Sequence, residues 1–157
     1  MNALSDEDVW TSAREVVELS FPGSVDFVVI ARFTAAAIGA RAGFDLDDIE
    51  DIRLAVDELS ISFGPIDTDS CLRYQFVRDG DAVTVRFTRE PAAGRVAGDK
   101  EVKESGVTQS RRALANWMQA RELSAVLLDE LVTSHGREIS DAGSVAWLMK
   151  RRGRRIR

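Results

Sequence analysis

Apolar side chains recur at helical spacing between residues 47 and 63. Their intervals of three, four, three and four residues bring them onto one face of a helix. Asp45 or Asp47 is suited to cap the first turn, and Gly64-Pro65 is suited to end the helix. We therefore predict an amphipathic helix over 47–63, whose buried stripe consists of Ile49, Ile52, Val56, Leu59 and Phe63.

Other segments carry strand or helix patterns. Residues 24–42 are apolar nearly all round, which predicts a helix that is largely buried. A further helix is expected over 110–135, ended by Gly136, and Asp79-Gly80 is a hairpin turn signal. Short alternating or apolar runs predict strands over 16–21, 72–77, 83–87 and 144–149.

The order of these elements indicates the fold class. It is strand, helix, helix, strand, strand, helix, strand, with a long loop over 89–106 before the last helix. This order predicts an α/β architecture, more narrowly an α+β two-layer sandwich with helices on one face of a mixed sheet. We expect a flexible N-terminus over 1–14, one domain over 15–150 and a basic C-terminal tail over 151–157.

Charge is unevenly distributed along the 157 residues. The chain has 21 Lys and Arg against 26 Asp and Glu, and six of the basic residues lie in the last eight positions. The remainder thus holds 15 basic against 26 acidic side chains, or a charge of −11. An acidic body repels nucleic acid and attracts basic protein surfaces, so we expect a protein partner and no direct nucleic-acid contact.

Several classes of protein are excluded by composition. No apolar run approaches a membrane span, and residues 1–20 lack the pattern of a secretory signal. Cys71 is the only cysteine and His135 the only histidine, so neither a disulfide framework nor a zinc site rich in these residues is expected. A reduced, cytoplasmic location is the simplest expectation, without membrane contact. His135 is expected at a helix C-terminus, where it would complement the helix dipole.

Candidate chemistry is concentrated on the helix over 47–63. The sequence contains neither a P-loop nor any Gly-x-Gly. Glu58 and Ser62 are four residues apart and therefore face the same side of the helix. They could form a solvated edge, or Glu58 could act as a general base with Ser62 holding a metal or substrate one turn away. The spacing leaves both interpretations open.

The segment from Asp51 to Leu59, DIRLAVDEL, resembles the signature helix of anti-sigma-factor serine kinases. These belong to the histidine-kinase-like (GHKL) ATPase superfamily. The order of further matching segments also agrees with the family: Phe21-Pro22 and Ile30-Ala31-Arg32 come before this helix, and the stretch from Ala142 to Lys150 comes after it. The resemblance covers about residues 15–152 and implies the histidine-kinase-like ATPase (Bergerat) fold.

The resemblance also implies a site for ATP and Mg²⁺. Glu58 matches the family's general base, and Ser62 stands where the family has a metal-binding Asn. Where the family has an adenine-binding Asp-x-Gly-x-Gly motif, no Asp is in register here and Gly94 is the one candidate remnant. The Gly-x-Gly of the phosphate-binding lid is missing. Phosphoryl transfer depends on positioning and charge neutralisation, so these departures argue against efficient catalysis.

The resemblance implies transcription regulation, as in a stress response. The leading hypothesis is an anti-sigma factor that binds an alternative sigma factor, acts as a homodimer and is released by an anti-anti-sigma factor. The alternatives are an active serine kinase that phosphorylates an anti-anti-sigma factor, and a regulatory module with another protein partner. Candidate contacts to a basic sigma factor are the acidic residues Asp45, Asp47, Asp48, Glu50 and Asp51.

Overall fold

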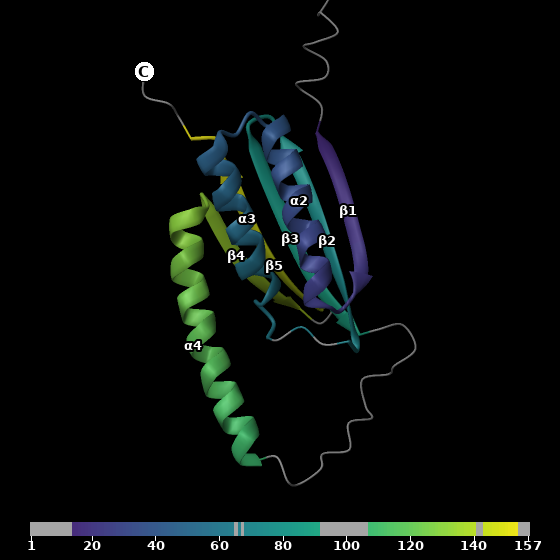
Figure 1. Ribbon diagram of the computed structural model, residues 1–157, viewed down its shortest axis with the longest axis vertical. Helices are drawn as coiled ribbons and strands as arrows, with labels where there is room; N and C mark the ends of the chain where they lie inside the picture. Colours follow the sequence, from purple (N-terminus) through teal and green to yellow (C-terminus); the bar gives the residue numbers. More distant parts are fainter. Residues whose placement is uncertain (1–13, 65, 67, 92–106, 141–142, 154–157) are drawn as a thin grey trace, which may run out of the picture.

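The computed structural model describes residues 14–64, 66, 68–91, 107–140 and 143–153. Figure 1 shows a sheet with its helices gathered on one face. This arrangement confirms the predicted two-layer α+β architecture. Most of the expected N-terminal segment, Gly94 and the last four residues of the expected tail lie outside the described residues.

Among the described residues, the sheet has five strands in the order β1-β2-β3-β5-β4, and every neighbouring pair is antiparallel. The mixed sheet that we predicted is therefore wrong. The helical connection after β3 leads to β4, which runs in the same direction as β3 but does not pair with it. A hairpin then returns β5 between them, antiparallel to both. The strands are β1 (Glu15–Pro22), β2 (Ser70–Asp79), β3 (Ala82–Pro91), β4 (Ser134–Ser140) and β5 (Gly143–Arg151).

The fifth strand, β4, was absent from the sequence prediction, which continued the last helix to residue 135. Its sequence SHGREIS lacks an apolar alternation, so only pairing with β5 identifies it as a strand. Gly136 lies opposite Trp147 in this pair. A Cβ atom at Gly136 would come within 2.9 Å of the Trp147 ring, so the glycine makes room for the tryptophan rather than ending a helix.

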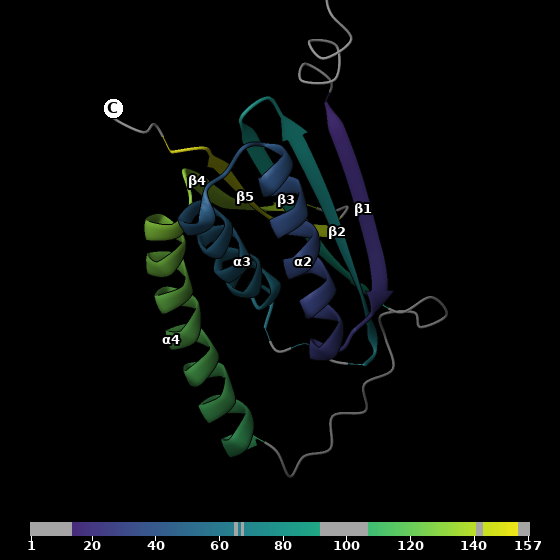
Figure 2. The same ribbon diagram turned by 45° about the horizontal axis from the view of Figure 1, so that its top comes forward.

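In the described part of the chain, three helices form the second layer: α2 (Val25–Arg41), α3 (Leu46–Ser60) and α4 (Val107–Leu131). Figure 2 shows α2 and α3 lying across the sheet, with α4 beside α3. Ser24 caps α2 through a bond from the Asp26 amide, and Asp45 caps α3 by accepting a 2.9 Å bond from the Asp48 amide. These caps satisfy backbone donors that have no partner within the helix.

The core lies between α3 and the centre of the sheet. Ile52, Val56 and Leu59 are at most 1% exposed, and Ile49 and Phe63 pack against the same cluster, which confirms the predicted stripe. The inward side chains of β2 and β3 complete it, among them Tyr74 and Phe87, whose ring centroids are 4.9 Å apart. This packing gives α3 a rigid position on the sheet.

Helix α2 differs from its prediction because only one of its sides is buried. Val28, Ala31, Ala35 and Ile38 face the core. On the other side, Val25 is 67% exposed and Phe33 is 62% exposed. No layer of the described residues covers this side, so the all-round apolar pattern leaves an exposed apolar surface rather than a buried helix.

Candidate functional site

Glu58 lies near the C-terminal end of α3 and is half-buried. The hydroxyl of Ser124, a buried residue on α4, donates a hydrogen bond to the Glu58 carboxylate. Ser124 was not singled out from the sequence, because no local pattern marks a contact across 66 residues. The carboxylate expected to act as a base is thus held between two helices.

Ser62 lies just beyond the end of α3 and is also half-buried. Its hydroxyl donates to the backbone carbonyl of Glu58 at 3.5 Å. The structure therefore brings the two predicted residues together at one end of the helix. Gly94, the third predicted residue, lies outside the described residues.

A cavity of about 510 Å³ opens beside these residues. It lies between the end of α3, the middle of α4 and the start of β4, and a volume of this size is typical of small-ligand sites. The sequence analysis missed its β4 wall because it missed the strand. The cavity is lined by Ile61, Ser62, Met118, Arg121, Glu122, Ser124, Ala125, Leu128, His135, Gly136 and Arg137.

The expected Mg²⁺ ion can be tested against these oxygen atoms. Mg²⁺ prefers six oxygen ligands in octahedral geometry. The Glu58 carboxylate accepts from Ser124, and the Ser62 hydroxyl donates to a backbone carbonyl. Within the described part of the chain, no group of three His, Cys, Asp or Glu side chains is placed to hold a metal. Both expected ligands are thus engaged by protein groups, and the Mg²⁺ site stays a prediction.

Asp57, the neighbour of Glu58, has a structural contact. Its carboxylate lies 3.2 Å from the guanidinium of Arg32 on α2. Burial raises the pKa of Asp57, and the Arg32 charge counteracts this effect. The pair links α2 to α3, so the two consecutive acidic residues of the DIRLAVDEL segment face different partners.

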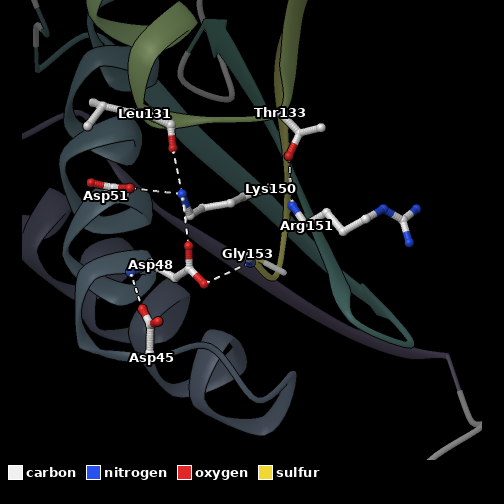
Figure 3. Close-up of polar contacts among 8 residues, drawn as sticks. All are labelled: Asp45, Asp48, Asp51, Leu131, Thr133, Lys150, Arg151 and Gly153. Atoms are coloured by element: carbon white, nitrogen blue, oxygen red, sulfur yellow. Dashed lines mark hydrogen bonds and ion pairs between the residues drawn. The ribbon is translucent and has the colours of Figure 1, made fainter. Parts of the chain in front are cut away.

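The acidic start of α3 is largely engaged within the molecule, as Figure 3 shows. Lys150 Nζ on β5 lies 3.3 Å from Asp48 and 2.9 Å from Asp51, and it donates to the Leu131 carbonyl. Asp48 also accepts from the Gly153 amide at 3.1 Å. Three of the five acidic residues considered as partner contacts, Asp45, Asp48 and Asp51, thus serve the fold.

His135 and Cys71 occupy positions unlike those of a catalytic pair. His135 lies on β4 rather than at a helix end, which corrects its prediction, and its Nε2 is 2.9 Å from the Asp129 carboxylate of α4. Cys71 lies on β2, with its sulfur 3.3 Å from the Ser20 hydroxyl. The two residues belong to different strands, and only His135 lines the cavity.

Comparison with known proteins yields a partial match. A stretch of 44 residues is 41% identical to the serine-protein kinase RsbW of Bacillus cereus strain AH187, and the same holds for RsbW of Bacillus thuringiensis strain Al Hakam. The match spans 28% of this chain, and it covers only 28% of the length of each relative. No family model matches the chain. The chain is therefore a partial homologue of RsbW serine-protein kinases.

None of the described helices is both long enough and apolar enough to span a membrane.

Proposed function

We propose that this protein is a cytoplasmic anti-sigma regulator that binds and sequesters an alternative sigma factor. The observation that carries the proposal is the 41% identity to RsbW serine-protein kinases over 44 residues, together with a two-layer α+β fold. The negative charge of the body supports a basic protein partner, because opposite charge steers association.

The arrangement around Glu58 favours sequestration over phosphoryl transfer. Ser124 donates a hydrogen bond to its carboxylate, and the residue one turn later is Ser62 rather than an asparagine with a side-chain amide. A kinase with ATP and Mg²⁺ would have to exchange both contacts for metal and water ligands. Binding of a sigma factor needs no such exchange.

A homodimer is part of the same proposal. The outer side of α2 supports it, because Phe33 and Val25 leave apolar surface uncovered next to the half-exposed Ile30. Contiguous exposed apolar surface is typical of protein interfaces. Phe33→Asp is expected to convert a dimer into monomers in sedimentation velocity. Leu123→Asp, at an equally exposed position on α4, should leave the dimer intact.

The function is tested by immobilising the full chain and presenting purified alternative sigma factors from the same genome, with the primary sigma factor as control. Selective retention of an alternative sigma factor is expected. If every sigma factor passes through, the sequestration proposal fails, and another protein partner becomes the leading hypothesis.

The kinase alternative is tested separately with radiolabelled ATP, Mg²⁺ and an anti-anti-sigma factor from the same genome. We expect no transfer of label to the anti-anti-sigma factor. Transfer that Glu58→Gln abolishes, while Asp57→Asn retains it, would favour the active serine kinase.

A further inference from the structure

Helix α4 lies at the outer end of the helical layer, next to α3, as Figures 1 and 2 show. Among its described side chains, Ser124 and Leu128 are buried, and Val132 continues this line just after the helix. Residues four apart lie on one side of a helix, and the Ser124 bond to Glu58 shows that this side faces α3. In both views no described element lies beside α4 on the side away from α3. Most of the described surface of α4 is therefore open to contact with another molecule.

An apolar row on α4 lies away from these buried residues. Leu123 is 61% exposed, Val126 is 59% exposed and Leu127 is 39% exposed. Leu123 and Leu127 are one helical turn apart, and Val126 lies beside both of them on the helix surface. These three residues are called the α4 row below. Apolar anchors at spacings of three and four residues are typical of a helix that contacts a partner helix.

Two carboxylates accompany the α4 row. Glu122 and Glu130 are both exposed, and each lies one helical turn from Val126. Neither of them forms an ion pair with another described residue, whereas the nearby Asp129 lies 2.9 Å from His135. This side of α4 thus presents apolar side chains together with negative charge that no described cation neutralises.

Charge complementarity selects the occupant of this surface. A helix with aliphatic side chains on one side and Lys or Arg next to them would match both the α4 row and its carboxylates. A second copy of the α4 row would bring like charges into one interface, and an anionic membrane would be repelled by the same carboxylates. A basic amphipathic helix is therefore the occupant that fits.

We propose that the α4 row, with Glu122 and Glu130, binds a basic amphipathic helix of a partner protein. The proposal rests on the proposed function in one respect, because the sigma factor is the protein expected to carry this helix. The three residues of the α4 row do not line the cavity beside Glu58, and they are not part of the α2 surface proposed for the homodimer. The partner helix and the second copy thus occupy different helices of the molecule.

The test titrates the full chain into a fluorescent synthetic peptide and follows the anisotropy. The probe consists of three Leu-Lys-Lys-Leu-Leu-Lys-Leu repeats, and its control has Glu in place of every Lys. The lysine peptide is expected to bind saturably, with a dissociation constant below about 100 μM, whereas the glutamate peptide should not bind detectably. Failure of the lysine peptide to saturate, or equal binding of the two peptides, would overturn the proposal.

Matched variants assign the binding to the α4 row. Leu123→Gln combined with Leu127→Gln should weaken binding of the lysine peptide at least about tenfold, because two apolar anchors are lost. Glutamine adds no charge and is a good helix former, so the helix itself should persist. Leu54→Gln, at a 52% exposed position on α3, should bind like the wild type. Equal binding by the double variant and the control would overturn the assignment.

A second pair of substitutions tests the charge. Glu122→Gln combined with Glu130→Gln should weaken binding of the lysine peptide and make it less sensitive to salt, because screening then has fewer charge pairs to act on. Glu138→Gln, at a 64% exposed position on β4, is the control and should change neither quantity. Unchanged affinity and salt dependence in the double variant would contradict the charge complementarity. Thermal unfolding of each variant establishes that it is folded.

The same variants separate this proposal from the sequestration proposal. Loss of sigma-factor retention in the double leucine variant, but not in Leu54→Gln, would support both. If the wild type retains no sigma factor while the lysine peptide binds to the α4 row, sequestration fails and the helix-binding surface stands. If all variants retain the sigma factor equally, the sigma factor binds elsewhere and the α4 assignment fails. Dissociation of a dimer by the double leucine variant in sedimentation velocity would assign the row to a second copy and overturn the proposal.

Discussion

Lys150 Nζ on β5 lies 2.9 Å from the Asp51 carboxylate on α3, across 99 residues of sequence. The lysine side chain is only 9% exposed, and it reaches Asp48 and the Leu131 carbonyl as well. This single ammonium group joins the last strand, the start of α3 and the end of α4. The basic residue that begins the C-terminal cluster is therefore a structural contact.

Lys150→Met should destabilise the fold strongly. The substitution keeps an apolar stem of similar length but leaves Asp48 and Asp51 without their cation. Breaking a buried pair by removing one partner costs about 3–5 kcal/mol. Urea denaturation at neutral pH measures the change in the free energy of unfolding.

Arg151→Ala is the matched control on the adjacent residue. Arg151 is 57% exposed and lies 2.7 Å from Asp81, so its loss should cost at most about 1 kcal/mol. Equal losses for the two variants would show that Lys150 is no more important than a surface ion pair.

Leu59→Ala tests the buried stripe of α3. Leu59 is 1% exposed in the core cluster, and a large-to-small change there should cost about 2–5 kcal/mol. Leu54→Ala, on the same helix but 52% exposed, should lie within about 0.5 kcal/mol of the wild type. Thermal and urea unfolding provide both values, and a reversed order would show that the stripe is assigned to the wrong side.

The charge of Glu15 makes the free energy of unfolding depend on pH in the acid range. Hydrogen bonds from Arg41 and then Arg78 lower the pKa of Glu15 from 4.5 to about 2. Because the folded-state pKa is the lower one, this contribution is complete above pH 4.5 and is lost as the pH falls to about 2. Glu15→Gln should be less stable than the wild type at neutral pH, and the difference should shrink across this range.

The control for Glu15 is Glu138→Gln. Glu138 is 64% exposed and lies 3.9 Å from Arg86, which predicts little effect on stability. Urea denaturation at several pH values compares the two variants. A constant deficit for Glu15→Gln down to pH 2 would contradict the role of its charge.

Tyr74 offers a clean titration because it is the only tyrosine. Burial raises the pKa of Tyr74 to about 12, against an ordinary value of 10, although its hydroxyl lies 2.7 Å from the Ser60 hydroxyl. Phenolate absorbance should therefore appear with a midpoint near 12 in the folded protein and near 10 in urea. The raised pKa means that stability falls as the pH rises between these values. A midpoint near 10 in the folded protein would show that Tyr74 is accessible to water.

Parts of the fold that depend on neighbouring residues were predicted correctly. The spacing of Ile52, Val56 and Leu59 identified α3 and its buried side, and Asp79-Gly80 identified the β2–β3 hairpin, where Gly80 has a φ of +58°. The same spacing brought Glu58 and Ser62 to one end of α3. Helical and strand periods are local, so a single segment carries this information.

Other features could not be predicted because they depend on contacts between distant segments. β4 is a strand only because it pairs with β5, and α2 is exposed on one side only because no described layer covers it. The Ser124 contact to Glu58 and the arginine-lined cavity arise where α4 meets α3 and β4.

The sequence by itself determined the periodic elements, the choice of Asp45 or Asp47 as the cap of α3, and the acidic body that suits a basic partner. The tertiary structure decided which charges face solvent: it buried Lys150 between two aspartates, and it left the Nε and Nη1 atoms of Arg137 without a hydrogen-bond partner. The physical reason is that periodicity is set by covalent neighbours. Burial and charge pairing are set by elements that meet only when the chain folds.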